Sequence, residues 1–492
     1  MRRLSLVITL ALVAAACNSD KPAVTTAATT TTAATSTSAT ATTGTSATTT
    51  TNVAGNVPEP AGAASLNDPY FPDLGNGGYD VSHYDIDLTV DTTSAELDAV
   101  TTITAVADET LATFNLDFVG LDISSVMVDG LEANYVREGP ELRISPDGGI
   151  VAGEEFSVRV AYSGRPQTIN LVSVGVEFGW LQTPEGIYVV AQPDGARTWF
   201  PSNDHPSDKA TFTFHITVAK PSTAAANGEL VATIDNGATR TFVWDLSSRA
   251  ATYLATIVIG EYERVESEGP GGVLIRDYLP ETFGGVVPAA FEVTAEAMEV
   301  LSEWFGPYPF DRYGHIVVYQ FPAALENQTL SLMGNRALSD EIVVHELAHQ
   351  WFGDSVTPTN WRGIWLNEGF ATFAEFLWAE HLGGEQQMID QISGLHAALQ
   401  TFEHLAIADP QESELLGPAV YLKGGMTLHA LRVTVGDDAM KDILTTYFER
   451  FADGNATTED FIAVAEEVAG QDLTGLFDAW LFSTDLPDLP SN

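Results

Sequence analysis

The pentapeptide His-Glu-Leu-Ala-His at residues 345–349 restricts the fold of this chain more than any other segment. Because His345 and His349 are four positions apart, an α-helix directs both imidazoles to one side, where they can bind one metal ion. Glu368 follows nineteen positions after His349 and can supply a third ligand. Two histidines and a carboxylate leave the fourth position of a tetrahedral zinc ion open, as catalytic sites require. We therefore predict a helix here, one bound Zn²⁺ and a metallohydrolase.

The flanks of the pentapeptide indicate a buried helix, predicted over residues 339–352. Ile-Val-Val precedes the pentapeptide at 342–344, and Trp-Phe-Gly follows it at 351–353. Ionisable side chains in such a helix need partners, and a cation supplies one. The alternative is a solvated helix that carries two histidines by chance. Glu346 lies beside the histidines, where its carboxylate can take a proton from a water molecule activated by the metal.

The first residues have the pattern of an export signal, with Met-Arg-Arg followed by an apolar run over residues 4–16. This run is too short to cross a bilayer and long enough for the core of a signal peptide. It ends in Ala-Ala-Ala before Cys17, which resembles the cleavage site of bacterial lipoproteins. We therefore predict a signal peptide over 1–17 and a lipidated Cys17. The alternative is an ordinary signal peptide with an incidental cysteine.

Residues 18–65 are predicted to form a disordered tether, because Thr, Ala and Ser dominate the tract up to about residue 60. Cys17 is the single cysteine of the chain, so the folded part has no disulfide and no thiol chemistry. No later segment is long and apolar enough to cross a membrane. We expect an exported protein, either a cell-surface lipoprotein on the outer face of the cytoplasmic membrane or a secreted one. The lipid anchor would be its only membrane contact.

The net charge is strongly negative, −46, with 21 Lys and Arg against 67 Asp and Glu. Nucleic acid is excluded as a partner, since contacts to phosphate need cationic patches. Acidic substrates are also disfavoured on approach. A solubility adaptation, to salty surroundings for example, explains such a composition without any specific function of an acidic surface.

Residues 66–262 are predicted to form a β-rich domain. Apolar and polar side chains alternate in several runs, and one of them places Tyr84, Ile86, Leu88 and Val90 on the same face. This period of two is typical of half-buried strands. Clusters of Gly and Asp separate the runs and indicate turns. The pattern favours an antiparallel saddle or sandwich.

Helical patterns dominate residues 263–492, which are predicted to form the second, catalytic domain. A strand is expected over 314–321. The fold class is therefore α+β, with a β domain followed by a mainly helical one. Besides the helix over 339–352, helices are expected to open at Pro288, to begin near Asn367, and to cover residues 385–404, 418–434, 437–451, 458–469 and 473–482.

Four further segments match motifs that occur together in one protein family. Ala-Ala-Leu-Glu-Asn at 323–327 matches Gly-x-Met-Glu-Asn, and Tyr-Leu-Lys-Gly at 421–424 matches Tyr-x-Lys-Gly. Residues 196–212 match Ala-Arg-x-x-Phe-Pro…Pro-x-x-Lys-Ala-x-Phe, and 477–480 match the close of the catalytic domain. With the zinc-ligand segments, about residues 79–490 resemble the gluzincin zinc aminopeptidases of the aminopeptidase N and leukotriene-hydrolase type. The resemblance implies a β saddle followed by a thermolysin-like zinc peptidase domain.

The resemblance also implies a role for each matching residue in the hydrolysis of a peptide bond. His345, His349 and Glu368 would hold the zinc. Glu346 would take the proton of the attacking water and pass it to the leaving amine. Tyr421 would donate a hydrogen bond to the oxyanion that forms in the transition state.

Two residues are implied as the binding site for the free amine of the substrate. Glu326 would bind the α-ammonium by a charge-assisted hydrogen bond, and Gln192 matches by its spacing the family position that helps to hold it. An amine held beside the metal allows cleavage only after the first residue. The implied activity is that of an aminopeptidase, whose partners are peptides with a free N-terminus. No oligomeric state is predicted.

Three departures from the family pattern affect the expected substrate site. Ala323 replaces a glycine whose backbone runs beside the substrate, so with Ala324 it is expected to line an altered first pocket. Leu325 replaces a methionine at the pocket wall. The large C-terminal helical domain of many relatives is missing from the match, so a more open cleft that admits longer peptides is expected.

Two other functions stay open at this point. A zinc endopeptidase with an open cleft would result if Glu326 and Gln192 form no amine site. A non-catalytic surface-binding protein on a peptidase fold is the other alternative, although the intact Glu346, Tyr421 and zinc ligands weigh against it.

Overall fold

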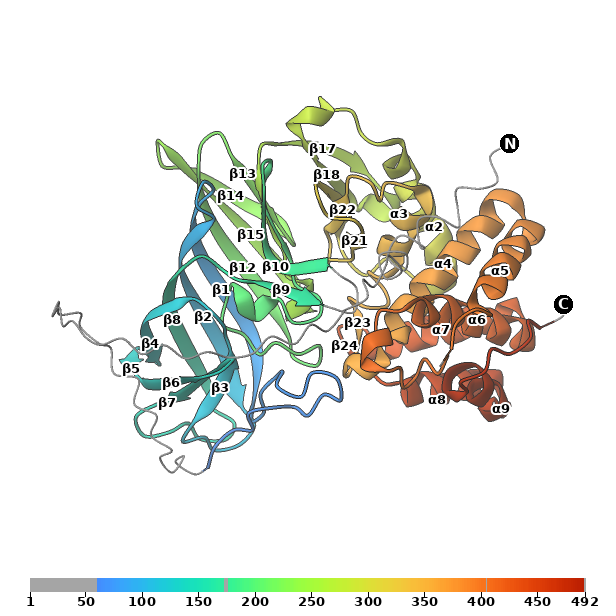
Figure 1. The fold of residues 1–492 in the computed structure, drawn as a ribbon, viewed down its shortest axis with the longest axis horizontal. Coiled ribbons are helices and arrows are strands. Elements are labelled where there is room, and N and C mark those ends of the chain that lie inside the picture. Colours follow the sequence, from blue (N-terminus) through green and yellow to red (C-terminus); the bar gives the residue numbers. More distant parts are fainter. Residues whose placement is uncertain (1–59, 172–175, 404, 491–492) are drawn as a thin grey trace, which may run out of the picture.

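The computed structural model describes residues 60–171, 176–403 and 405–490 (Figure 1). A β-rich half and a mostly helical half lie side by side, which confirms the predicted α+β class. The predicted signal peptide, Cys17 and nearly all of the predicted tether lie outside the described residues. Within the described ranges, no helix combines the length and the apolar character needed to cross a membrane.

An eight-stranded sheet forms the centre of the β-rich half, in the order β14-β15-β12-β1-β2-β8-β4-β5. Every second side chain of its central strands is buried, because successive residues of a strand point to opposite faces. The strands are β1 (Tyr79–Asp91), β2 (Glu96–Ala107), β4 (Asp122–Val128), β5 (Leu131–Glu132), β8 (Glu155–Gly164), β12 (Lys209–Ala219), β14 (Glu229–Asp235) and β15 (Thr239–Ala251).

One pair of strands in this sheet is parallel and so differs from the predicted antiparallel arrangement. Strands β1 and β12 run parallel, in a register that extends from His83 opposite Thr211 to Val90 opposite Val218. The other pairs of the sheet are antiparallel. The alternation of apolar and polar residues is the same in both arrangements, so the sequence pattern does not reveal the strand direction.

Two smaller sheets complete the β-rich half. The five-stranded sheet has the order β13-β16-β11-β10-β9, and the three-stranded sheet has the order β3-β7-β6. The five-stranded sheet matters for function because β11 leads directly into Gln192. The strands are β3 (Phe114–Asp117), β6 (Asn134–Glu138), β7 (Glu141–Ser145), β9 (Thr168–Leu171), β10 (Val176–Thr183), β11 (Gly186–Val190), β13 (Thr223–Ala226) and β16 (Ile257–Gly260).

The second half opens with a sheet of six strands, of which one, over 314–321, was predicted from the sequence. Its order is β17-β18-β20-β22-β21, with β19 beside β18. The domain boundary predicted at residue 262 falls at the first residue of β17, and as a domain limit it stays a prediction. The strands are β17 (Tyr262–Glu268), β18 (Leu274–Pro280), β19 (Arg312–Tyr313), β20 (His315–Val318), β21 (Ala324–Leu325) and β22 (Ser331–Gly334).

Most helices of the second half lie close to their predicted ranges, and a few differ. A short helix, η5 (Ala289–Val293), follows Pro288 before α2 begins, α5 ends five residues earlier than predicted, and α9 ends at Phe477, where η8 (Asp478–Phe482) follows. Helix α3 is shorter than predicted because the chain turns back after it, with the Asp354 N–H donating to the carbonyl of His349. The elements are α2 (Thr294–Phe305), α3 (Asp340–Ala348), α4 (Trp365–Gly383), α5 (Glu385–Leu399), α6 (Pro418–Val435), α7 (Asp437–Phe451), α8 (Thr458–Ala469), α9 (Thr474–Phe477) and the parallel pair β23 (Val356–Pro358) and β24 (Gly454–Ala456).

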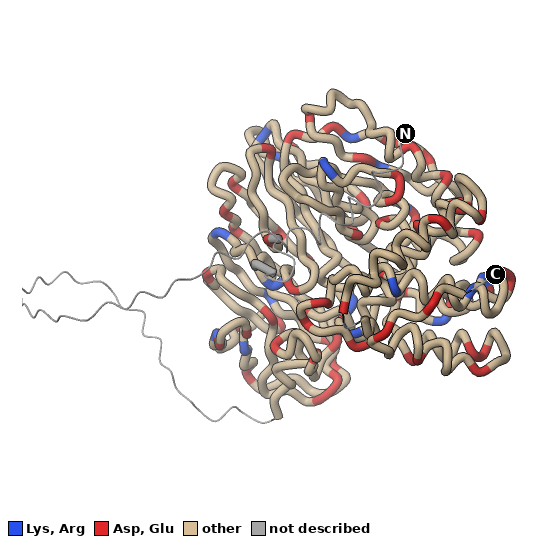
Figure 2. The backbone as a smooth tube through the Cα atoms, turned by 45° about the vertical axis from the view of Figure 1, so that its right-hand side comes forward, with Lys and Arg blue, Asp and Glu red and all other residues tan. Residues whose placement is uncertain are grey.

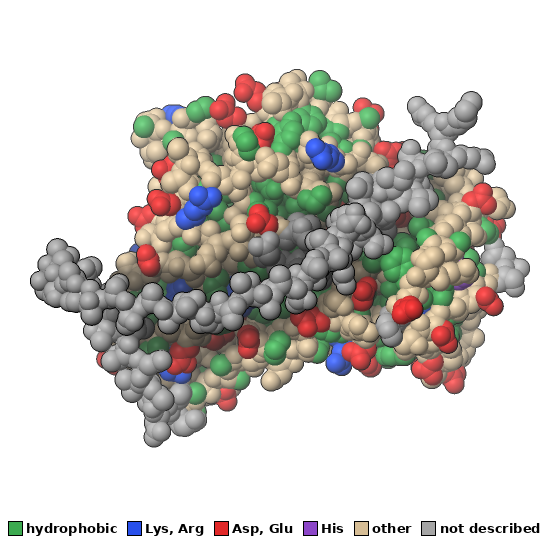
Figure 3. Space-filling model, in the orientation of Figure 1, with side chains coloured by type: hydrophobic (Ala, Val, Ile, Leu, Met, Phe, Trp, Pro, Cys, Tyr) green, Lys and Arg blue, Asp and Glu red, His purple; other side chains and the backbone are tan. Residues whose placement is uncertain are grey.

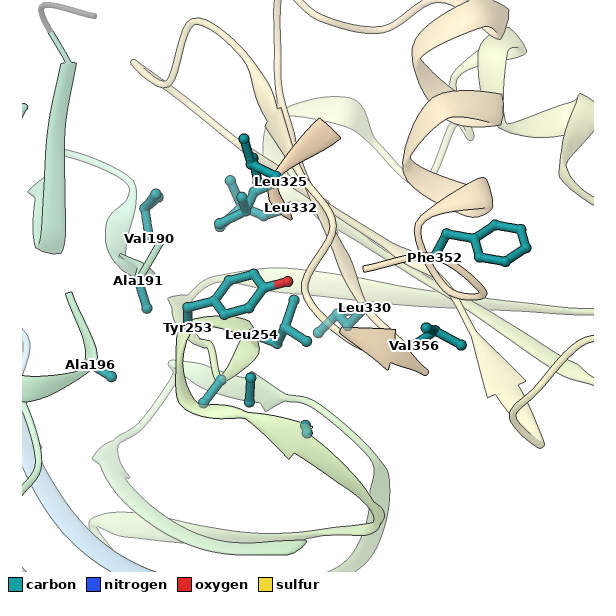
Figure 4. Packing of buried hydrophobic residues seen from close by; sticks show 14 of the residues in the cluster. Val190, Ala191, Ala196, Tyr253, Leu254, Leu325, Leu330, Leu332, Phe352 and Val356 are labelled. Carbon is teal, nitrogen blue, oxygen red and sulfur yellow. The ribbon is translucent and has the colours of Figure 1, made fainter. Parts of the chain in front are cut away.

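The two halves share a continuous hydrophobic core. Figure 4 shows part of their junction, where Tyr253 and Leu254 of the β-rich half lie near Leu330 of the second half. A buried lysine side chain also bridges this junction. The ammonium of Lys209, at the start of β12, donates to the backbone carbonyls of Asp354 and Ser355, at 2.8 Å in each case. The β-rich half is therefore bonded to the loop that follows α3.

Acidic residues are spread along the backbone of both halves, and basic residues are few (Figure 2). On the face drawn in Figure 3, Asp and Glu side chains likewise outnumber Lys and Arg. No single acidic region stands out in these views, which agrees with the interpretation of the charge as a general surface property.

Candidate active site

Helices α3 and α4 bring together the three predicted zinc ligands. The ligand atoms of His345, His349 and Glu368 all lie within 4.8 Å of one another, and the three residues are buried. Glu368 Oε2 lies 3.3 Å from His345 Nε2 and 3.4 Å from His349 Nε2. Two zinc bonds of about 2.0–2.1 Å at a tetrahedral angle separate their ligand atoms by about 3.3–3.4 Å. The geometry and the donor set therefore fit one Zn²⁺.

Each histidine of this group is oriented by a hydrogen bond from its other ring nitrogen. Nδ1 of His345 donates to Glu375 Oε1 at 2.7 Å, and Nδ1 of His349 donates to the carbonyl oxygen of Phe352 at 3.1 Å. Such contacts fix the tautomer and present Nε2 to the metal. Glu375 was not predicted from the sequence, although it lies seven residues after Glu368, two turns along the same face of α4.

The charges of this group favour a cation. Burial lowers the pKa of His345, but hydrogen bonds to Glu368 and Glu375 outweigh this effect and raise the pKa well above its ordinary value. Burial raises the pKa of Glu368, but the charge of His349 and the hydrogen bond from His345 outweigh this effect, and the pKa is lowered. A divalent cation would take the place of the protons on the imidazoles, so metal binding would release protons.

Glu346 projects beside the metal group from α3 and is itself buried. Burial raises the pKa of Glu346 to about 8, although the charges of His345 and His349 act against this rise. Its Oε2 atom accepts no hydrogen bond. Burial therefore makes Glu346 a stronger proton acceptor than an exposed glutamate, which suits a general base.

Tyr421 lies on α6, and its ring is stacked on that of His345, with a centroid distance of 6.0 Å and an interplanar angle of 17°. Burial and the nearby carboxylates of Glu368, Glu326 and Glu346 raise the pKa of its phenol above the ordinary value. The hydroxyl group therefore keeps its proton and can donate a hydrogen bond toward the metal group.

The two residues predicted to bind the substrate amine are in direct contact. Gln192 Nε2 donates to Glu326 Oε1 at 2.9 Å, and both side chains are buried. Gln192 follows β11 in the β-rich half, whereas Glu326 follows β21 in the second half. The carbonyl of Glu326 accepts a hydrogen bond from Nε2 of Gln350, the residue after the ligand His349, at 3.2 Å, so Glu326 lies beside the end of α3. Burial raises the pKa of the Glu326 carboxyl group, although the charge of His349 acts against this rise.

The predicted pocket residues lie on the strand that leads into Glu326. Ala324 belongs to β21 and pairs with Met333, and the carbonyl oxygen of Ala323 accepts the N–H of Gly334 at 2.9 Å. Both side chains are partly exposed, and Leu325 is buried. The structure thus places Ala323 and Ala324 beside the proposed amine site.

A further contact, not predicted from the sequence, supports the start of α4. The hydroxyl of Tyr253 donates to the carbonyl of Gly353 at 3.1 Å and accepts a hydrogen bond from Asn367 Nδ2 at 3.2 Å. Asn367 precedes the ligand Glu368 in the chain. Tyr253 of the β-rich half therefore helps to position one zinc ligand of the second half.

Comparisons with known proteins match both halves of the chain to domains of one peptidase family. The chain matches the peptidase M1 N-terminal domain over residues 81–254 and the peptidase family M1 domain over 289–480. It is similar to the crystal structure of an M1 zinc metallopeptidase from Deinococcus radiodurans, with 32% identity and a TM-score of 0.81 over 87% of this chain and 99% of that one. A mutant of the Deinococcus radiodurans enzyme bound to a Tyr-Ser-Ala substrate is 31% identical, with a TM-score of 0.81, over 87% of this chain and 100% of that one.

Curated relatives are longer than this chain. Aminopeptidase M1-A of Oryza sativa subsp. japonica is 29% identical over 59% of this chain and 36% of its own length. Probable aminopeptidase 1 of Sulfurisphaera tokodaii is 26% identical over 77% of this chain and 50% of its own length. Aminopeptidase N of Streptomyces lividans is 28% identical over 66% and 42%, respectively. The chain thus spans between about a third and a half of these relatives.

Proposed function

Because the chain belongs to peptidase family M1, we propose that it is a zinc-dependent aminopeptidase that removes residues from the free N-terminus of peptides. The observation that carries this proposal is the hydrogen bond between Gln192 and Glu326 at the edge of the metal group. The names of the curated relatives and the peptide bound to the Deinococcus radiodurans peptidase support it.

The contact between Gln192 and Glu326 suits the recognition of an ammonium group. Glu326 is a buried carboxylate beside other acidic groups, and it gains from a cationic partner. The substrate's α-ammonium can supply that charge through a charge-assisted hydrogen bond. The amide oxygen of Gln192 remains available as a second acceptor, because Nε2 makes the contact to Glu326. Both residues together would select the end of a peptide.

The catalytic step follows from the residues around the metal group. Zinc, when bound by His345, His349 and Glu368, would polarise the scissile carbonyl and make water a better nucleophile. Glu346 would take the proton of that water and give it to the leaving amine. Tyr421 would donate its hydroxyl hydrogen bond to the oxyanion as it develops.

A blocked N-terminus is the direct test of this proposal. Acetylation removes the ammonium and leaves Glu326 unpaired, so kcat/KM for a good peptide should fall at least about a hundredfold, roughly 3 kcal/mol of transition-state binding. The measurement compares matched free and acetylated peptides on the zinc-loaded protein. The masses of the products locate the cleaved bond.

Glu326→Ala provides the matched variant for this experiment. It should reduce the preference for the free peptide mainly by lowering kcat/KM for that peptide, with little effect on the acetylated one. Equal rates for free and acetylated peptides, or cleavage at internal bonds, would instead support a zinc endopeptidase. No turnover of any peptide by the zinc-loaded protein would support the non-catalytic binding protein.

We also propose that the protein is exported and carried on the outer face of the cytoplasmic membrane by a lipid on Cys17. The support is the sequence pattern of residues 1–17, together with a Thr, Ala and Ser tract that can act as a tether. Expressed in a bacterial host, the chain should incorporate labelled palmitate, and Cys17→Ser should not. Equal labelling of both chains would exclude Cys17 as the attachment site, and no labelling of either would favour a secreted protein.

A further inference from the structure

The loop that joins β21 to β22, residues 326–330, begins with Glu326 and is here termed the amine loop. All five of its residues are buried. The N–H and carbonyl groups of a buried loop need hydrogen-bond partners inside the protein. The partners of the amine loop therefore determine where the Glu326 carboxylate stands.

The β-rich half holds the middle of the amine loop. Asn227 is fully buried, and its Nδ2 donates to the carbonyl of Gln328 at 2.7 Å. The backbone N–H of Gly228 donates to Oγ1 of Thr329 at 2.9 Å. The amine loop is thus attached to the half of the molecule that also carries Gln192.

A single side chain, that of Gln350, joins the amine loop to the zinc-ligand segment. Gln350 directly follows the ligand His349 and is fully buried. Its Nε2 donates to the carbonyl of Glu326 at 3.2 Å, and its Oε1 accepts the N–H of Thr329 at 2.8 Å. Within the described ranges, no other hydrogen bond connects the amine loop with residues 340–356.

The backbone of Thr329 makes this connection stiff. Its φ is 65°, in the left-handed region that a β-branched residue rarely adopts. Such a conformation persists only where its surroundings enforce it. Here Gln350 binds the N–H of Thr329, and Gly228 binds its hydroxyl oxygen. The amine loop therefore cannot shift relative to the end of α3 without losing bonds on both sides of this residue.

The distance between the amine site and the metal group decides which peptide bond meets the catalytic residues. His345, His349 and Glu368 all belong to the second half, whereas the amine loop is bonded to the β-rich half through its middle residues. A misplacement of about 1 Å between a bound substrate and its catalytic groups can lower the rate about 10²-fold. The contact that fixes this distance is therefore expected to affect turnover strongly.

We propose that Gln350 is a positioning residue that sets the distance from the amine site to the zinc group and so confines cleavage to the first peptide bond. The inference rests on the proposed aminopeptidase function. Gln350 acts through the backbone of Glu326 and Thr329. Its loss should lower turnover without weakening the capture of the ammonium, because Gln192 and the amine loop remain attached to the same half.

Gln350→Met tests this role, because methionine has a similar length and forms neither hydrogen bond. For a peptide with a free N-terminus, kcat should fall about 10–100-fold, whereas KM should stay within about twofold. The acetylated peptide makes no use of the amine site, so its kcat/KM should not change. The preference for the free peptide should therefore shrink, and zinc should remain at one ion per chain.

Two further variants accompany this measurement. Gln350→Asn keeps the amide on a shorter side chain that cannot span both partners, so it should show a smaller loss in the same direction. This variant carries the test if Gln350→Met does not fold. Thr101→Val is the control, because it removes a buried hydrogen bond to the hydroxyl of Tyr162 within the β-rich half. It should leave kcat and the preference for the free peptide unchanged.

The possible results separate this inference from the proposed function. An unchanged kcat and an unchanged preference in both Gln350 variants would overturn the positioning role. So would an equal loss for free and acetylated peptides, or a loss of zinc, since either result would assign Gln350 to the support of the metal group. Equal hydrolysis of free and acetylated peptides by the unaltered chain would refute the amine site itself, and this inference with it.

Discussion

Replacing Glu346 by glutamine is expected to lower kcat by about 10³–10⁴-fold while the zinc content stays at one ion per chain. Glutamine has the same shape but cannot accept the proton of the attacking water. Glu346 is also not among the three residues whose atoms converge on the metal position, so the metal should remain. The measurement pairs single-turnover and steady-state kinetics with elemental analysis of zinc.

The outcome separates two roles for Glu346. Glu303→Gln, an exposed carboxylate on α2, serves as the control and should leave both quantities unchanged. Near-normal kcat in Glu346→Gln would refute the general base. Loss of zinc in the same variant would show that the carboxylate supports the metal group rather than the proton transfer.

Tyr421→Phe should lower kcat by roughly 10²–10³-fold with little change in KM, because an oxyanion donor acts mainly in the transition state. The ring is retained, so its stacking on His345 should persist. Tyr319→Phe removes a phenol whose hydroxyl bonds to Thr282 Oγ1 at the surface, and it should have no effect. A change confined to KM would show that Tyr421 binds the substrate and does not stabilise the transition state.

Local patterns explain why much of this molecule could be predicted from its sequence. Residues four positions apart, such as His345 and His349, point to the same side only on a helix. The observed α3 brings both side chains to one metal position. Runs of alternating residues became strands such as β1 and β2. Helices with long apolar repeats, such as α6 and α7, lie within a residue of their predicted bounds.

Features that depend on contacts between distant parts of the chain could not be predicted from local sequence patterns. The parallel pairing of β1 with β12 and the short strands β19 and β21 leave no distinctive local pattern. Lys209 and Asp354 are 145 residues apart, and nothing in either segment indicates their contact. The contact between Gln192 and Glu326 was predicted through a family resemblance, since composition and periodicity contain no information about it.

That last contact has an evolutionary consequence. The pair proposed to recognise the end of a peptide is split between two structural units, one residue from each, whereas the metal group belongs to the second unit alone. If both residues are needed for recognition, a mutation of one of them would call for a compensating mutation in the other unit. The two units should be inherited as a pair, because exchanging one of them between distant relatives would disturb the recognition of chain ends together with the contacts of Lys209 and Tyr253 that support the loop after α3 and the start of α4.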